Sequence, residues 1–146
     1  MFLFRKYVSR GAVVLLFLVT VLVGTSGSSA QAATYCNTML TTTFGIGNAL
    51  PNRECLTYVS SRGYRGYVEF NPPQAYQLAG RFFVTLTRNG TQVAKSFEYV
   101  NPIVNPGTTW PTPYVQKGSG YYCTKAWFRR TSAINDLIRY TCRQLP

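Results

Sequence analysis

The residues best suited to acid–base chemistry in this sequence are four carboxylates. They are Glu54, Glu69, Glu98 and Asp136, and the sequence contains no histidine. The absence of histidine excludes serine–histidine triads, histidine metal sites and histidine general bases. The hairpins predicted below give Glu98 and Asp136 arginine partners, which leaves Glu54 and Glu69 as a free pair. A glycosidase needs two carboxylates that flank the scissile bond, so a hydrolase using Glu54 and Glu69 is one alternative.

No other catalytic or cofactor-binding signature is present in the sequence. No serine has a lysine three positions later, and there is neither a Gly-x-Ser-x-Gly elbow nor a phosphate-binding Walker loop. Clusters of Asp and Glu suited to calcium are also missing. We therefore expect a protein that is not an enzyme, that uses no cofactor or metal, and whose four carboxylates are surface charges.

Four cysteines offer a covalent framework: Cys36, Cys55, Cys123 and Cys142. An even number in a short exported chain indicates two disulfides, for which three connectivities exist. The wide spacing argues against zinc, whose cysteine ligands usually lie two to four residues apart. Cys36 and Cys55 are 19 positions apart, and so are Cys123 and Cys142. This matched spacing predicts the pairs Cys36–Cys55 and Cys123–Cys142.

The amino-terminal segment has the pattern of a secretory signal peptide. Residues 1–10 carry three basic side chains, residues 12–24 are apolar except for Thr20, and Ala30-Gln31-Ala32 forms a small-x-small cleavage site. The apolar run is shorter than the roughly 18–20 residues that a membrane-spanning helix needs. We expect residues 1–32 to be removed, leaving 33–146 as one disulfide-stabilised, secreted β domain with no transmembrane anchor.

The charge of the expected domain is strongly positive. Without the leader, twelve Lys and Arg face four acids, so the net charge is near +8. Such a surface attracts anionic partners, among them envelope polymers, phospholipid head groups and nucleic acid. We do not expect nucleic acid, because an exported chain meets little of it and no nucleic-acid-binding signature is present. A solvated basic surface with no dedicated partner remains the alternative.

A first β-hairpin is predicted around Asn89-Gly90. These residues separate two β-prone runs, 82–88 and 91–98, and Asn-Gly is typical of a type I′ turn with positive φ at both positions. The two-residue turn predicts the pairs Leu86–Val93, Phe82–Phe97 and Arg81–Glu98. One feature conflicts with this register, because it places Lys95 on the same face as the apolar side chains.

A second hairpin follows if Cys123 lies opposite Cys142. That register predicts the pairs Thr124–Thr141, Trp127–Ile138, Phe128–Leu137 and Arg129–Asp136. The connection would run through residues 131–134. A short helix over Ser132–Arg139 is the competing interpretation.

The remaining patterns also favour short strands. Residues Tyr64–Phe70, Tyr114–Gln116 and Gly120–Arg130 are predicted strands, whereas the segment between Cys36 and Cys55 is predicted to be loop-rich. Residues 101–113 contain four prolines and predict an irregular connection or an edge segment. The fold class predicted is all-β, a small antiparallel β-sandwich, immunoglobulin-like or barrel-like, with two disulfides.

One stretch resembles a known family. Gly120-Tyr121-Tyr122-Cys123-Thr124-Lys125 is similar to the F strand of an immunoglobulin variable domain, and the resemblance implies a sandwich. It covers about six residues, and the tryptophan that this family carries about a dozen residues after its first cysteine is missing here. A Cys55–Cys123 bridge would be the immunoglobulin-like connectivity.

Alternation along residues 120–130 predicts a binding surface. It places Tyr122, Thr124, Ala126 and Phe128 on a core face, and Tyr121, Cys123, Lys125, Trp127 and Arg129 on the other face. The neighbouring strand adds Tyr140 opposite Lys125. Arg139 and Arg143 fall on the opposite face and contribute only at long range. Burial of Trp127 under the loops is the alternative.

These observations favour a secreted binding module over an enzyme. Adjacent basic and aromatic side chains are typical of surfaces that bind sugars, anionic polymers or proteins. We expect an anionic cell-envelope polymer or a protein as the target. An inhibitor or antimicrobial effector that inserts residues 101–113 is the second class. The doubled Arg62-Gly63-Tyr64 and Arg65-Gly66-Tyr67 resembles an Arg/Gly-rich binding segment, but a turn that leads into a strand is the favoured explanation.

Overall fold

The computed structural model describes residues 31–44, 49–129 and 135–146. Most of the expected signal peptide and the expected hairpin connection at 131–134 lie outside the described residues. In the part of the chain that the structure describes, no helix is long and apolar enough to cross a membrane. The described chain forms antiparallel strands, as the fold class predicted.

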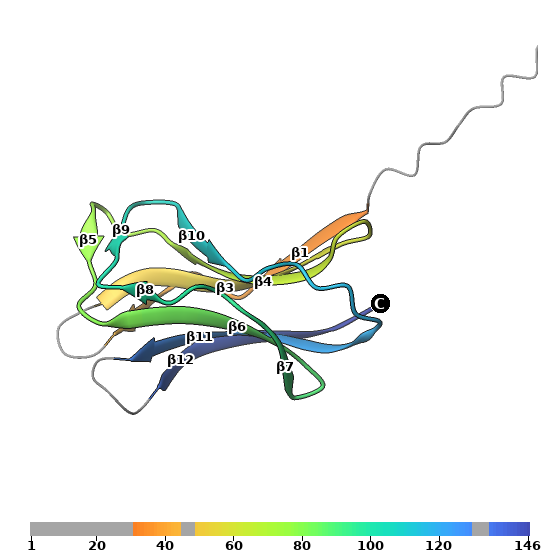
Figure 1. Cartoon of the computed structure of the whole chain (residues 1–146). Helices are drawn as coiled ribbons and strands as arrows, with labels where there is room; N and C mark the ends of the chain where they lie inside the picture. Colours follow the sequence, from red (N-terminus) through yellow and green to blue (C-terminus); the bar gives the residue numbers. More distant parts are fainter. Residues whose placement is uncertain (1–30, 45–48, 130–134) are drawn as a thin grey trace, which may run out of the picture.

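The strands form two main sheets that lie as two layers in Figure 1. The first sheet contains β1 (Ala32–Cys36), β2 (Leu40–Thr43), β3 (Ala49–Val59), β4 (Gly63–Phe70) and β10 (Thr108–Pro111). The second contains β6 (Arg81–Arg88), β7 (Thr91–Lys95), β8 (Tyr99–Val100), β11 (Gly120–Arg129) and β12 (Asp136–Leu145). A small third sheet pairs β5 (Tyr76–Gln77) with β9 (Ile103–Val104).

The core lies between the two main sheets. One cluster gathers eleven buried side chains: Phe44, Leu50, Val68, Phe70, Leu78, Phe82, Val84, Val104, Trp110, Ala126 and Phe128. A second cluster is built around Tyr64 and Tyr122, whose stacked rings have their centroids 4.0 Å apart. The predicted core row of β11 is confirmed, since all four of its members are buried.

Each disulfide joins an edge strand to its neighbour within one sheet. Cys36–Cys55 links β1 to β3, and Cys123–Cys142 links β12 to β11. The predicted pairing is therefore confirmed, and the bridge between sheets that the immunoglobulin-like arrangement would require is absent. The cross-link holds the edge strand in place, because the backbone of an edge strand is hydrogen-bonded on one side only.

The first hairpin has the predicted turn, but its register changes after the two pairs Arg88–Thr91 and Thr87–Gln92. Asn89 and Gly90 have φ values of 49° and 83°. A bulge then places Leu86 opposite Ala94 instead of Val93, and Phe82 pairs with Tyr99 of β8 instead of Phe97. The bulge lets consecutive Val93 and Ala94 both pack against the core. It also turns Lys95 outward, which removes the conflict noted in the sequence.

The second hairpin is confirmed near the disulfide and wrong beyond it. The predicted register holds from Gly120 to Ala126, after which Trp127 pairs with Leu137 and Phe128 with Asp136. The three predicted pairs Trp127–Ile138, Phe128–Leu137 and Arg129–Asp136 are therefore wrong. The bulge points consecutive Ile138 and Arg139 inward, toward the core and toward Glu54. The competing helix is also wrong, because β12 begins at Asp136.

The predictions for the remaining strands and loops are partly confirmed and partly wrong. The strand at Tyr64–Phe70 is present in β4, whereas Tyr114–Gln116 forms only a single bridge through Val115. The segment between Cys36 and Cys55 contains β2 and residues 49–54 of β3. The prediction that this segment is loop-rich is therefore wrong. The proline-rich segment supplies the edge strand β10, with Trp110 buried in the core.

Candidate functional site

The outer face of the second sheet carries the surface predicted from β11. We define the aromatic face as Tyr121, Lys125, Trp127, Leu137 and Tyr140. Tyr140 lies opposite Lys125, and the bulge places Leu137 opposite Trp127. Tyr121, Tyr140 and Leu137 are 51%, 58% and 43% exposed. The Cys123–Cys142 bridge lies in the same sheet between Tyr121 and the Lys125–Tyr140 pair, so it fixes the two strands that present these side chains.

Trp127 is neither free in solvent nor part of the core. The indole is half-buried, and its Nε1 donates a hydrogen bond of 2.8 Å to the Thr85 hydroxyl. Its ring stacks on Phe83 with 6.2 Å between centroids and 12° between planes. Phe83 and Thr85 are buried on this outer face. Trp127 is thus fixed in one orientation and keeps part of its ring open to a partner.

Glu98 binds the basic side chains at one end of this surface. Its carboxylate lies 2.7 Å from Lys95 Nζ, 2.7 Å from Arg129 Nη2 and 3.6 Å from Arg81 Nη1. The hydrogen bond from Lys95, together with the charges of Lys95, Arg129 and Arg81, lowers the pKa of Glu98. Arg129 is therefore engaged within the protein. Among the described residues, no ion pair engages Lys125, so it is the cation of the aromatic face that can meet a ligand.

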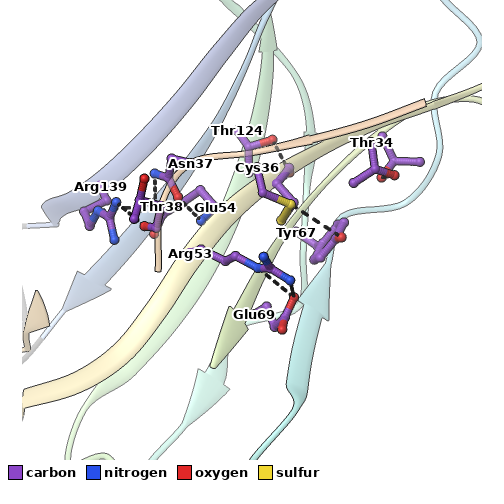
Figure 2. Close-up of a disulfide and its surroundings, with 12 residues drawn as sticks. Thr34, Cys36, Asn37, Thr38, Arg53, Glu54, Tyr67, Glu69, Thr124 and Arg139 are labelled. Atoms are coloured by element: carbon purple, nitrogen blue, oxygen red, sulfur yellow. Dashed lines mark hydrogen bonds and ion pairs between the residues drawn. A yellow bond between two sulfur atoms is a disulfide. The ribbon is translucent and has the colours of Figure 1, made fainter. Parts of the chain in front are cut away.

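Arg139 and Arg143 point away from the aromatic face, as the alternation predicted. Arg143 lies over the ring of Tyr35 on β1, 4.5 Å from its centroid. Arg139 reaches across to the first sheet, where Nη1 donates to the Asn52 carbonyl at 2.9 Å and Nη2 donates to the Thr38 carbonyl at 3.0 Å. Figure 2 shows Arg139 approaching Asn37, Thr38 and Glu54. Arg139 therefore joins the two sheets.

Glu54 is fully buried beneath this contact, so the expectation that it is a surface charge is wrong. Asn37 Nδ2 donates to Glu54 Oε2 at 2.6 Å, and Arg139 Nε lies 3.6 Å from the same oxygen. The other carboxylate oxygen is buried and has no hydrogen-bond partner. Burial raises the pKa of Glu54, and the hydrogen bond from Asn37 and the charge of Arg139 oppose that rise. A fully buried carboxylate held in this way stabilises the contact between sheets but is closed to a substrate.

The structure does not bring Glu54 and Glu69 together. Arg53 lies opposite Glu69 across β3 and β4, and the next residue, Glu54, points to the other side of the sheet. Glu69 Oε2 accepts hydrogen bonds from Arg53 Nε at 3.0 Å and Nη2 at 2.9 Å (Figure 2). The two carboxylates therefore point to opposite sides of the first sheet and do not flank a common site for a scissile bond.

Sequence reasoning missed two parts of this surface. Leu137 was expected to pair with Phe128, and its place beside Trp127 depends on the bulge in β12. Glu98 was expected to pair only with Arg81, whereas it also binds Lys95 and Arg129. The misplaced Lys95 in the predicted hairpin was the available signal, because turning it outward requires a bulge.

A groove of about 390 Å³ lies between two chain segments. It is lined by Lys95, Ser96, Phe97, Tyr99, Pro111, Thr112 and Pro113. Among the described residues, no group of three or more His, Cys, Asp or Glu could hold a metal ion. No protein-family model, curated protein or solved structure matches this chain.

Proposed function

We propose that this protein is an exported, non-catalytic module that binds an anionic polymer of the cell envelope through the aromatic face. The observation that carries the proposal is the fixed, half-open indole of Trp127 with an unpaired Lys125 nearby on the same strand. Flat rings stack on sugar rings, and an ammonium group attracts the anionic substituents of a polymer.

The length of the aromatic face supports a linear ligand. Tyr121 and Trp127 are six residues apart on β11, which corresponds to roughly 20 Å along an extended strand. Tyr140 and Leu137 widen the face on β12. An extended surface of this kind suits successive units of a chain better than a compact small molecule, which usually binds in an enclosed pocket.

Export rests on two independent features. The leader has the pattern of a signal peptide, and the two disulfides fit an oxidising, extracellular environment. Amino-terminal sequencing of the protein from culture supernatant should return Ala33 as the first residue. Recovery of a chain that still begins at Met1 would contradict the proposed processing.

The groove gives a second candidate function, an inhibitor or effector that binds a protein. Phe97 beside the groove is 85% exposed, and Val100 and Ile103 are also exposed. Exposed apolar side chains mark many protein-binding surfaces. Polymer binding by a basic protein should weaken steeply as salt rises, whereas insertion of apolar side chains into a protein should not.

Two matched substitutions separate the candidates. Trp127→Ala should weaken co-sedimentation with isolated envelope polymer by about 30-fold, the equivalent of about 2 kcal/mol for an anchor residue. Phe97→Ala removes another exposed aromatic side chain and should leave polymer binding within about twofold. If Phe97→Ala abolishes binding and Trp127→Ala does not, the polymer binds at the groove and the aromatic face is not its binding surface.

A further inference from the structure

The doubled Arg-Gly-Tyr sequence forms a surface on the other sheet. Its two glycines serve packing, because a Cβ on Gly63 would lie 2.1 Å from the Val115 carbonyl oxygen and a Cβ on Gly66 2.5 Å from the Thr124 hydroxyl. Gly63 also has φ of +86°, which L side chains rarely adopt. The glycines therefore explain the spacing of the repeat, and they leave its arginines without a structural role.

The two arginines converge on one tyrosine. The guanidinium carbon of Arg65 lies 4.7 Å from the ring centroid of Tyr114 and 5.8 Å from that of Tyr67. The guanidinium carbon of Arg62 lies 5.6 Å from the same Tyr114 ring. We define the cationic face as Arg62, Arg65, Tyr67 and Tyr114. Arg65 and Tyr67 share one side of β4 with Glu69, whereas the residues between them point to the core.

The positive charge of this face is uncompensated. Glu69 lies on the same side of the sheet but binds Arg53. Within residues 31–44, 49–129 and 135–146, no carboxylate pairs with Arg62 or Arg65, and neither guanidinium donates a hydrogen bond. Arg65 Nε is moreover shielded from water and has no partner. Two guanidinium groups lie over one ring, and no described carboxylate pairs with either, so together they attract an anion.

We propose that the cationic face binds the phosphate groups of a phosphodiester-linked envelope polymer, at a site separate from the aromatic face. Phosphate is the favoured anion because a guanidinium presents a planar pair of N–H donors that match two phosphate oxygens. Cation–π contacts with Tyr67 and Tyr114 restrain the guanidinium groups and reduce the freedom lost on binding. With the aromatic face on the opposite sheet, one module would hold two polymer segments, one on each side.

Inorganic polyphosphate is the direct probe for the purified protein. Arg62→Gln/Arg65→Gln should lower its affinity at least 30-fold and reduce the slope of log K against log salt by about 1.5 to 2. Arg81→Gln/Arg143→Gln removes the same charge elsewhere and should change the affinity less than threefold. Arg62→Lys/Arg65→Lys keeps the charge but loses the donor pair, so its affinity should fall at least threefold. Thermal unfolding of each variant checks that the fold is retained.

Three results would overturn the proposal. An equal loss in both glutamine pairs would show that net charge alone attracts the polymer. Wild-type affinity in the lysine pair would remove the basis for phosphate recognition. An oligonucleotide bound more than about tenfold tighter than polyphosphate would identify single-stranded nucleic acid as the occupant, since base stacking adds affinity on tyrosines. Polyphosphate has no sugar ring on which Trp127 could stack, so this test does not depend on stacking at the aromatic face.

Discussion

The two outer faces of the sandwich use similar side chains for different chemistry. Each has tyrosines and arginines, and each sheet has a disulfide that joins an edge strand to its neighbour. On the second sheet Glu98 binds three cations, so the aromatic face next to it is largely apolar with one unpaired lysine. On the first sheet Glu69 binds only Arg53, and the cationic face keeps its charge. The positions of a few carboxylates therefore decide how much uncompensated positive charge each face keeps.

The same comparison separates inner from outer aromatic residues on β11. Phe128 is buried in the core, whereas the neighbouring Trp127 covers Phe83 and Thr85 on the outside. Phe128→Ala should cost about 3–5 kcal/mol of unfolding free energy, because it leaves a cavity in the core. Trp127→Ala should cost about 1–2 kcal/mol, because it removes one hydrogen bond and exposes part of Phe83. Urea unfolding measures both, and equal costs would show that Trp127 belongs to the core.

The two disulfides should contribute equally to stability. Both close loops with a sequence separation of 19, so loop-closure entropy predicts about 3 kcal/mol for each. Cys36→Ser/Cys55→Ser and Cys123→Ser/Cys142→Ser should therefore lower the free energy of unfolding by similar amounts. A much larger loss for the second pair would mean that the aromatic face depends on its bridge more than the first sheet does. Chemical denaturation under non-reducing conditions supplies the comparison.

Removing Glu98 should make the second sheet resemble the first. Glu98→Gln releases Lys95, Arg81 and Arg129 from their ion pairs, which should cost only about 1 kcal/mol because these side chains are partly exposed. Polyphosphate affinity should rise severalfold at low salt as three cations become available. Binding by Glu98→Gln that equals the wild type would contradict the role assigned to this carboxylate. Glu69→Gln, which releases Arg53 alone, should produce the smaller rise.

Two carboxylates should give opposite pH dependences. The lowered pKa of Glu98 means that its contribution is present above the ordinary carboxylate pKa and is lost as the pH falls through its lowered value. The raised pKa of Glu54 has the reverse sign: its contribution is fullest below the ordinary pKa and declines as the pH rises through the raised value. Unfolding of wild type, Glu98→Gln and Glu54→Gln from about pH 3 to about pH 8 separates the two slopes. Slopes of the same sign would contradict the burial of Glu54 or the ion pairs of Glu98.

Period-two alternation and turn chemistry carried most of the predictions that the structure confirms. They gave the all-β class, the Asn89-Gly90 turn and the buried row of β11, and the matched spacing of the cysteines predicted both disulfides. The wrong pairs all lie beyond the two bulges, where one extra residue reverses the faces of everything that follows. The bulge in β12 turns Ile138 toward the core between the sheets, and alternation along a single strand does not contain that information. The convergence of Arg62 and Arg65 on Tyr114 was also not predicted, because Tyr114 is distant from both in the sequence.

The aromatic face can be tested directly through its tryptophan. The sequence has two tryptophans, so the indole N–H groups of Trp110 in the core and Trp127 on the surface give two signals in a proton–nitrogen correlation spectrum. On titration with soluble envelope-polymer fragments, the Trp127 indole and the amides of Lys125 and Tyr140 should shift, while the Trp110 indole stays in place. If the fragments bind without moving the Trp127 signal, or shift only the residues around Phe97, polymer binding through the aromatic face is contradicted.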